Sequence, residues 1–356
     1  VKKIQSLQAV HGKDAVGVVI GDKLSTEEIY LTHHMAQDIM DTDMIYSANA
    51  TSGGLDDVLG FDGSTVDYDQ MLNTDLILLV GSATDIRYHY PMIGARILRA
   101  QKHGVQLAVI SNDDTLYERH ADYRLKLGPD VAVLKQIVAA LHEVNPVADE
   151  AFAADIKDVY VNEEVRYFAK CLREAKHAVV VFDRGRVSKE AAQLLSMIAV
   201  MSGHIGSPRN GIMQIRPRAN TQSLVDIGVK KDMDVLKEDI RSGKIKGLLF
   251  FGHDMNEEAI GNLDFLMVAD TMLTHIMPYA DVVLPLGGFG SVEGSFINSE
   301  CKVRKIKSTI STAIGKENWQ VIAGLIKKVD NPEEFDTIHD VRLAIAKDHP
   351  AYKPAL

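Results

Sequence analysis

The sequence predicts an α/β protein built on two doubly wound, mainly parallel sheets, and three observations support this prediction. Short apolar runs recur along the chain without polar alternation, which is typical of strands buried on both faces. Helical segments separate these runs, as they do in βαβ units. The chain has 356 residues, of which 46% are hydrophobic, so it is long enough for two lobes with a core each.

The predicted strands share an unbroken apolar run that ends at a turn or at a polar residue. They are Ala15–Ile20, Asp75–Val80, Val105–Ile110, Ala178–Phe182, Lys246–Phe251 and Phe265–Val268. In an α/β sheet, ligands bind in the loops that follow the carboxyl ends of the strands. These loops are therefore the first places to look for a functional site.

Helical patterns fill most of the stretches between these strands. Ser25 and Glu28 form a capping box that opens a helix reaching to about Met40. The other predicted helices are Tyr90–His103, Asp130–His142, Asn162–Lys176, Lys189–Met201, Asn318–Lys328 and Glu333–Lys347. The alternation of strand and helix favours parallel sheets covered on both faces.

Composition and charge exclude several classes of protein. The formal net charge of −10 argues against nucleic acid as a partner. No apolar run can span a bilayer and no signal peptide is present, so we expect a cytoplasmic protein without membrane insertion. The two cysteines, Cys171 and Cys301, lack cluster spacing. Because an iron–sulfur cluster needs about four thiolates, we expect none bound by these residues.

The segment from Ala269 to Glu300 is the most informative part of the chain. It contains the end of one predicted strand, a second apolar run and then a turn-rich stretch with four glycines. Glycine lets the backbone approach a ligand closely, and backbone N–H groups can bind an anion. The segment is therefore either a ligand-binding loop or a long connection between two elements, and its chemistry favours neither.

Three other loops carry groups that can bind anions or ligands. Gly81 and Ser82 follow a predicted strand, where an ordinary strand-to-helix turn is the alternative to a phosphate site. Arg209, Arg216 and Arg218 form a positive cluster in and after a glycine-rich loop, for which a solvated surface loop is the alternative. The turn Gly252–Asp254 follows another predicted strand.

Two long patterns in the chain resemble the molybdopterin oxidoreductase family, which includes formate dehydrogenase catalytic subunits and the large iron–sulfur subunit of respiratory complex I. The first pattern consists of Asp270, Thr274, Ala280-Asp281-Val282, Leu284-Pro285, Glu293-Gly294, Phe296, Asn298 and Glu300. The second consists of Gly203, Gly206, Gly211, Arg216, Asn220, Gln222, Asp226 and Gly228.

The resemblance implies an arrangement that sequence patterning does not place by itself. It implies a discontinuous lobe of residues 1–45 with 217–356 and an inserted lobe of residues 46–216. It also implies that the chain lacks the family's N-terminal iron–sulfur region and C-terminal β-barrel. By the same resemblance, the possible or vestigial pterin contacts are Gly81, Ser82, Gly252, Asp254 and Asp270.

The metal site implied by the resemblance is degenerate in this chain. In formate dehydrogenases, a cysteine or selenocysteine followed by histidine precedes a glycine–leucine pair. Aligning Gly54-Leu55 with that pair puts Ser47 at the metal-ligand position and Ala48 at the histidine. No cysteine or histidine lies in Asp41–Leu55, so the thiolate ligand and the base are both missing. The arginine that helps hold formate in the family corresponds to Arg216.

These observations predict a non-catalytic scaffold subunit or domain of an NADH- or ferredoxin-linked electron-transfer complex. We expect no cofactor in this chain, and iron–sulfur and flavin subunits as partners. One alternative is an active molybdopterin or tungstopterin oxidoreductase, formate dehydrogenase-like, with its remaining parts on other chains. The other is an unrelated nucleotide-binding module, which the absence of a Walker loop and of a Rossmann glycine fingerprint disfavours.

Overall fold

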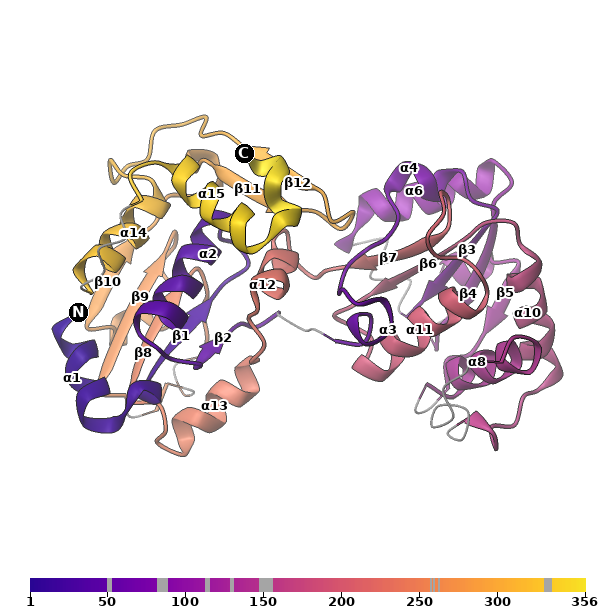
Figure 1. Cartoon of the computed structure of the whole chain (residues 1–356), viewed down its shortest axis with the longest axis horizontal. Helices are drawn as coiled ribbons and strands as arrows, with labels where there is room; N and C mark the ends of the chain where they lie inside the picture. The colour runs from indigo at the N-terminus through magenta and orange to yellow at the C-terminus, as the bar shows by residue number, and fades with distance from the viewer. Residues whose placement is uncertain are drawn as a thin grey trace. The chain divides into compact units, whose positions relative to one another are not determined.

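A computed structural model of the chain describes residues 1–49, 53–81, 89–112, 116–128, 131–146, 156–256, 258, 260–261, 263–329 and 335–356. The chain divides into two compact units (Figure 1). Unit 1 consists of Val1–Thr51, Arg218–Asn298 and Lys302–Leu356. Unit 2 consists of Ser52–Pro217 and Ser299–Cys301.

Unit 1 is built on a parallel sheet of five strands. In chain order they are β1 (Val16–Ile20), β2 (Ile45–Tyr46), β8 (Gly247–Phe251), β9 (Phe265–Asp270) and β10 (Val282–Pro285). Their order across the sheet is β10-β9-β8-β1-β2, so the direction of winding reverses between β1 and β8. A separate antiparallel pair joins β11 (Gly294–Ile297) to β12 (Val303–Ile306).

The two faces of this sheet carry different amounts of helix. The larger core lies under α1 (Lys2–His11), α2 (Thr26–His34), α12 (Thr221–Ile227), α14 (Asn318–Lys328) and α15 (Ile338–Asp348). On the opposite face, α13 (Met233–Arg241) packs over β1 and β8 around a smaller core. No helix in the described part of the chain is both long and apolar enough to cross a membrane.

Unit 2 contains a second parallel sheet of five strands. They are β3 (Leu76–Val80), β4 (Gln106–Ile110), β5 (Tyr123–Leu125), β6 (Ala178–Asp183) and β7 (Gly211–Ile215), in the order β5-β4-β3-β6-β7. The surrounding helices are α3 (Asp56–Leu59), α4 (Tyr68–Leu72), α6 (Pro91–Lys102), α7 (Leu116–Arg119), α8 (Ala132–Val144), α10 (Glu163–Glu174) and α11 (Lys189–Met201). Its winding reverses between β3 and β6.

The α/β class with two parallel sheets is confirmed, and so is the capping box at the start of α2, where Ser25 and Glu28 cap each other. The helix predicted to reach Met40 is α-helical only as far as His34, because a π-helical turn follows at Met35–Ile39. The strands β2 and β5 were not predicted, since two or three residues carry no readable pattern.

Candidate functional site

The first candidate site of unit 1 lies at the carboxyl ends of β1 and β8, where the winding of the sheet reverses. The backbone turns after these strands touch: Gly21 N–H donates to Phe251 O at 2.8 Å. A Cβ on Gly21 would lie 1.9 Å from Gly252 O, so no side chain fits between the two turns. A crevice at such a reversal is the usual ligand position in a doubly wound sheet.

Asp270, at the end of β9, is held by a lysine that the sequence analysis missed. Lys23 Nζ lies 3.0 and 3.2 Å from the two carboxylate oxygens of Asp270. The Asp270 side chain is fully buried, whereas that of Lys23 is 52% exposed. Lys23 could have been found because it lies in the loop after β1, on the same edge of the sheet.

Asp254, in the turn after β8, organises the connection that follows β9. Its carboxylate accepts from His275 Nδ1 at 2.8 Å and from His275 N–H at 3.1 Å. Burial works to raise the pKa of Asp254, but the bonds from His275 and from Met255 N–H outweigh it and lower the pKa. Gly252, Asp254 and Asp270 therefore share one edge of the sheet, and both carboxylates already have partners.

Ser47 lies just beyond β2 and is buried. Its N–H donates to Lys231 O at 2.9 Å. Nearby along the chain, Asn49 donates to Asp22, which also accepts from Thr221 at 3.1 Å. The carboxylate of Asp22 thus ties the loop after β1 to the segment that carries Asn49 and to α12.

Two neighbouring glutamates at the start of α2 form a buried acidic site that the sequence analysis treated only as a cap. Glu27 accepts from Arg342 Nε at 2.8 Å and from Ser295 N–H at 2.7 Å. Glu28 closes the capping box with Ser25 N–H, and burial raises its pKa to about 7. The sequence carried no signal of this burial, because acidic residues in the first turn of a helix are ordinarily favoured by the helix dipole whether or not they are exposed.

Two of the four glycines of the Ala269–Glu300 segment, Gly287 and Gly294, pack against helices of unit 1. Gly287 N–H donates to Asn318 Oδ1 at 2.6 Å, and Asn318 donates back to Gly287 O. A Cβ on Gly294 would lie 2.6 Å from Ser25 Cβ. These glycines allow the chain to lie directly on α14 and α2, which is a packing role.

In unit 2, Arg216 directly follows β7 and forms a buried ion pair with Asp62. The Nη2 atom lies 3.1 Å from Asp62 Oδ1, and the two side chains are only 2% and 7% exposed. Asp62 also accepts from Gly53 N–H at 2.9 Å and from Gln214 Nε2 at 3.0 Å. The predicted cluster of arginines is therefore partly neutralised, because its buried member has an internal carboxylate. The sequence offered no signal for Asp62, which lies in an irregular loop.

Gly81 lies at the end of β3, where the winding of the unit 2 sheet reverses, and Ser82 lies outside the described residues. Arg184, which follows β6 on the same edge, was not predicted. It donates to Gly53 O at 3.1 Å and to Val187 O at 2.8 Å. Burial lowers the pKa of Arg184. Backbone carbonyls thus hold this second cation.

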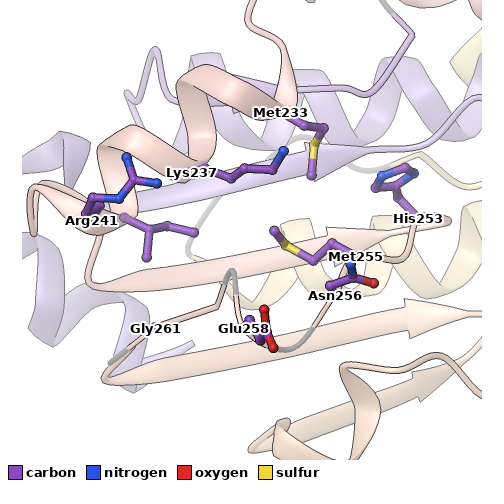
Figure 2. Close-up of a pocket in the computed structure, with 9 residues that line it drawn as sticks. Met233, Lys237, Arg241, His253, Met255, Asn256, Glu258 and Gly261 are labelled. Atoms are coloured by element: carbon purple, nitrogen blue, oxygen red, sulfur yellow. The ribbon is translucent and has the colours of Figure 1, made fainter.

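A separate pocket of unit 1, with a volume of about 620 Å³, lies between α13 and the connection from β8 to β9 (Figure 2). It is lined by Met233, Lys237, Ile240, Arg241, His253, Met255, Asn256, Glu258 and Gly261. Of the loops predicted to bind ligands, only the turn Gly252–Asp254 contributes to this lining, through His253. Within the described ranges, no three His, Cys, Asp or Glu side chains are placed to share a metal ion.

Comparison with known proteins gives matches over nearly the whole chain. The family model for molybdopterin oxidoreductases matches residues 1–328. The alpha subunit of F420-dependent formate dehydrogenase from Methanocaldococcus jannaschii is 24% identical, with 96% of this chain and 61% of the relative covered. A putative formate dehydrogenase of Staphylococcus aureus is 23% identical, with 98% of this chain and 43% of the relative covered. The chain thus spans about half the length of these relatives.

Two solved structures share the fold. Acetylene hydratase from Pelobacter acetylenicus superposes with a TM-score of 0.67 at 12% identity, over 92% of this chain and 57% of the hydratase. A chain of the formyltransferase/hydrolase complex from Methylorubrum extorquens superposes with a TM-score of 0.59 at 16% identity, over 92% of this chain and 95% of that one. The family match, which covers 328 of 356 residues, shows that the chain belongs to the molybdopterin oxidoreductase family.

Proposed function

We propose that this chain is a formate dehydrogenase-like scaffold subunit or domain without a redox centre of its own. The observation that carries the proposal is the buried pair of Arg216 and Asp62. By the resemblance, Arg216 is the residue that would hold an anionic substrate. Here its charge is already balanced by a carboxylate of its own unit.

The energy of this pair opposes binding of an external anion. Removing one partner of a buried ion pair typically costs about 3–5 kcal/mol, because the other charge is left buried and unbalanced. An incoming formate would have to displace Asp62, which also holds Gly53 and Gln214. We therefore expect Arg216 to stabilise unit 2 and not to bind substrate.

The residues around Ser47 do not fit the metal centre of the family. Molybdenum and tungsten in formate-type chemistry need a thiolate or selenolate ligand and a neighbouring base, and Ser47 and Ala48 provide neither. The serine hydroxyl is the remaining candidate ligand, and the alanine cannot relay a proton. We derive no catalytic step through such a group.

The remaining contacts predicted for a pterin are proposed to be vestigial. Asp270 is paired with Lys23, and Asp254 is committed to His275. By the resemblance, Gly81, Ser82 and Gly252 remain the other possible contacts of a pterin. We also propose that the lobes inherited from the family have boundaries near residues 45/46 and 216/217.

The proposed partners are iron–sulfur and flavin subunits of an NADH- or ferredoxin-linked complex. Support comes from relatives that are named as alpha subunits of formate dehydrogenases. A chain of this fold and similar extent also occurs in the Methylorubrum extorquens complex. Both observations are consistent with a role as one part of a larger assembly.

Metal analysis of the purified chain tests the proposal. The chain would be produced in a host that makes molybdopterin, with a catalytic formate dehydrogenase alpha subunit expressed in parallel as the loading control. Elemental analysis should then find close to zero moles of molybdenum plus tungsten per mole of this chain. The control should contain about one mole of metal per mole of protein. One mole of either metal per mole of this chain would overturn the proposal and favour an active oxidoreductase.

A further inference from the structure

Connections between parallel strands normally carry helices that cover the sheet, but on one face of the unit 1 sheet the described residues of two connections form no α-helix. The β8–β9 connection spans residues 252–264, and its described residues form no α-helix. The β9–β10 connection, residues 271–281, contains only the 3₁₀ turn Met277–Tyr279. By contrast, the connections from β3 to β4 and from β6 to β7 each carry a helix of twelve or more residues. This face is covered mainly by α13.

The 620 Å³ pocket lies on this sparsely covered face (Figure 2). α13 forms one wall with Met233, Lys237 and Arg241, and the β8–β9 connection forms the other. Ile240, also on α13, packs in the core of this face together with Ile260 from the connection. The pocket is thus a hollow beside α13, on the side where a crossover helix would ordinarily lie.

The apolar part of the pocket suits a protein side-chain surface. Met233 and Met255 contribute to opposite walls, and unbranched methionines adapt to partners of irregular shape. Burial lowers the pKa of His253, so its imidazole is a neutral polar group at physiological pH. On the same sheet, Val283 of β10 is in register with the buried Val268 and is 46% exposed.

The charged side chains of the pocket are distributed unequally between its walls. Lys237 and Arg241 lie on α13, whereas Glu258 lies on the connection (Figure 2). Within α13, Lys237 pairs with Asp234 at 2.7 Å and Arg241 pairs with Glu238. Such exposed pairs contribute only about 0–1 kcal/mol, so carboxylates of a partner can compete for both cations.

We propose that this hollow docks an amphipathic helix of a partner polypeptide. Its apolar stripe would lie between Met233 and Met255, with carboxylates toward Lys237 and Arg241 and a cation toward Glu258. A docked helix would supply the missing cover of the sheet, since neighbouring helices pack with axes about 8–10 Å apart. The proposal rests on the chain being a subunit, but it makes no use of the metal content that tests the proposed function.

Site-specific photo-crosslinking tests the docking site on the full chain. A photoreactive amino acid would replace Lys237 in one variant and Asn256 in another, because both side chains are exposed and line the pocket. The control position is Leu343, which is 48% exposed on α15. Each variant would be irradiated in the cells that naturally make the chain, and the crosslinked peptides would be sequenced by mass spectrometry.

The expected result is one peptide of one other polypeptide, captured from both pocket positions and not from Leu343. Its sequence should show apolar residues at helical spacing, flanked by Asp or Glu on one side. A synthetic copy should bind the chain about tenfold more weakly in K237E than in wild type, as expected when a rim charge is reversed. The matched control K347E, at an exposed lysine of α15, should bind as wild type does.

Several outcomes would overturn the proposal. They are capture of different peptides from the two pocket positions, capture of a second copy of this chain, a captured peptide without an apolar stripe, and no captured peptide. A small molecule retained in native mass spectrometry and lost in K237E would also overturn it, by showing a ligand pocket. Circular dichroism and thermal melting of K237E verify folding, which an exposed substitution should leave unchanged.

Discussion

Arg216 Nη2 lies 3.1 Å from Asp62 Oδ1, and both side chains are almost completely removed from water. The pair joins the end of β7 to the loop that begins at Gly53, because Asp62 also accepts the Gly53 N–H. An arginine that resembles a substrate-binding residue is thus part of the internal packing of unit 2. Several measurable consequences depend on this and on similar pairs.

Replacement of Asp62 by alanine should destabilise the chain and create a site for small carboxylates. The loss should be about 3–5 kcal/mol, because Arg216 is left buried and unbalanced. Formate or acetate should restore part of the melting temperature of D62A, compared with chloride at equal ionic strength. The matched control is D57A. Asp57 pairs with Lys189 and is 38% exposed, so its loss should cost only about 0–1 kcal/mol. A wild-type chain that gains as much from formate as D62A would contradict the assignment.

The pair of Lys23 and Asp270 should stabilise unit 1 more than a surface pair does. K23M leaves the fully buried Asp270 without its cation, so we expect a loss of about 1–3 kcal/mol in urea denaturation. Lys13 is the control, since its side chain is 51% exposed, much as Lys23 is, but its partner Asp41 is 78% exposed. K13M should cost about 0–1 kcal/mol. Equal losses in the two variants would refute this ranking.

Glu28 should make stability depend on pH near neutrality. Its pKa is raised to about 7 in the folded chain, above the ordinary value of about 4.5, so the folded state binds the proton more tightly. Its contribution is therefore fully present below about pH 4.5 and is lost as the pH rises through 7. E28Q should remove this slope and be more stable than wild type at pH 8, by about 1–3 kcal/mol.

Asp340 provides a control of opposite sign for Glu28. It occupies the same capping-box position in α15 but is only partly buried, and its hydrogen bonds to Thr337 lower its pKa. Its contribution is present above the ordinary aspartate pKa and declines as the pH falls through the lowered value. D340N should therefore alter stability in acid and leave the slope between pH 5 and 8 unchanged. If the stability of E28Q still depends on pH near neutrality, another group is responsible for that dependence.

Substitution of Gly21 should disrupt the contact between the backbone turns that follow β1 and β8. A Cβ at this position would lie 1.9 Å from Gly252 O, so the two backbone turns would have to separate. We expect G21A to lose at least about 3 kcal/mol, at the upper end for overpacking. G288A is the control, because no atom lies within 4 Å of the added Cβ and the φ of −78° suits alanine. Thermal melts of equal midpoint would show that the two turns can separate at little cost.

Much of the fold follows from local patterns in the chain. The continuous apolar runs that became β1, β3, β4, β6, β8 and β9 read clearly as buried strands, and α14 begins and ends at Asn318 and Lys328 as predicted. Local chemistry also predicted the capping box of α2. The short strands β2 and β5 and the hairpin β11–β12 were missed, because their pairing depends on distant partners. The segment Gly211–Ile215 was not predicted as a strand and forms β7, which pairs with β6.

The candidate site was less predictable than the fold. Gly252, Asp254 and Asp270 were named from the family resemblance, and the structure places all three at one edge of the sheet because each follows or ends a parallel strand. Their partners Lys23 and His275 are 247 and 21 residues distant in sequence from Asp270 and Asp254, respectively. No local pattern reports such pairs. The pocket beside α13 was also missed, since it arises from the absence of helix in the described part of a connection.

The sequence alone determined the α/β class, most of the strands and the family resemblance. It also determined that Asp41–Leu55 contains no cysteine or histidine. These properties are local, since each depends on residue types at fixed spacing along the chain. The neutralisation of Arg216 by Asp62, 154 residues apart, required the folded chain. So did the packing of Gly294 on Ser25 and the hollow beside α13. Burial and charge balance depend on which side chains meet in space, and only tertiary packing determines that.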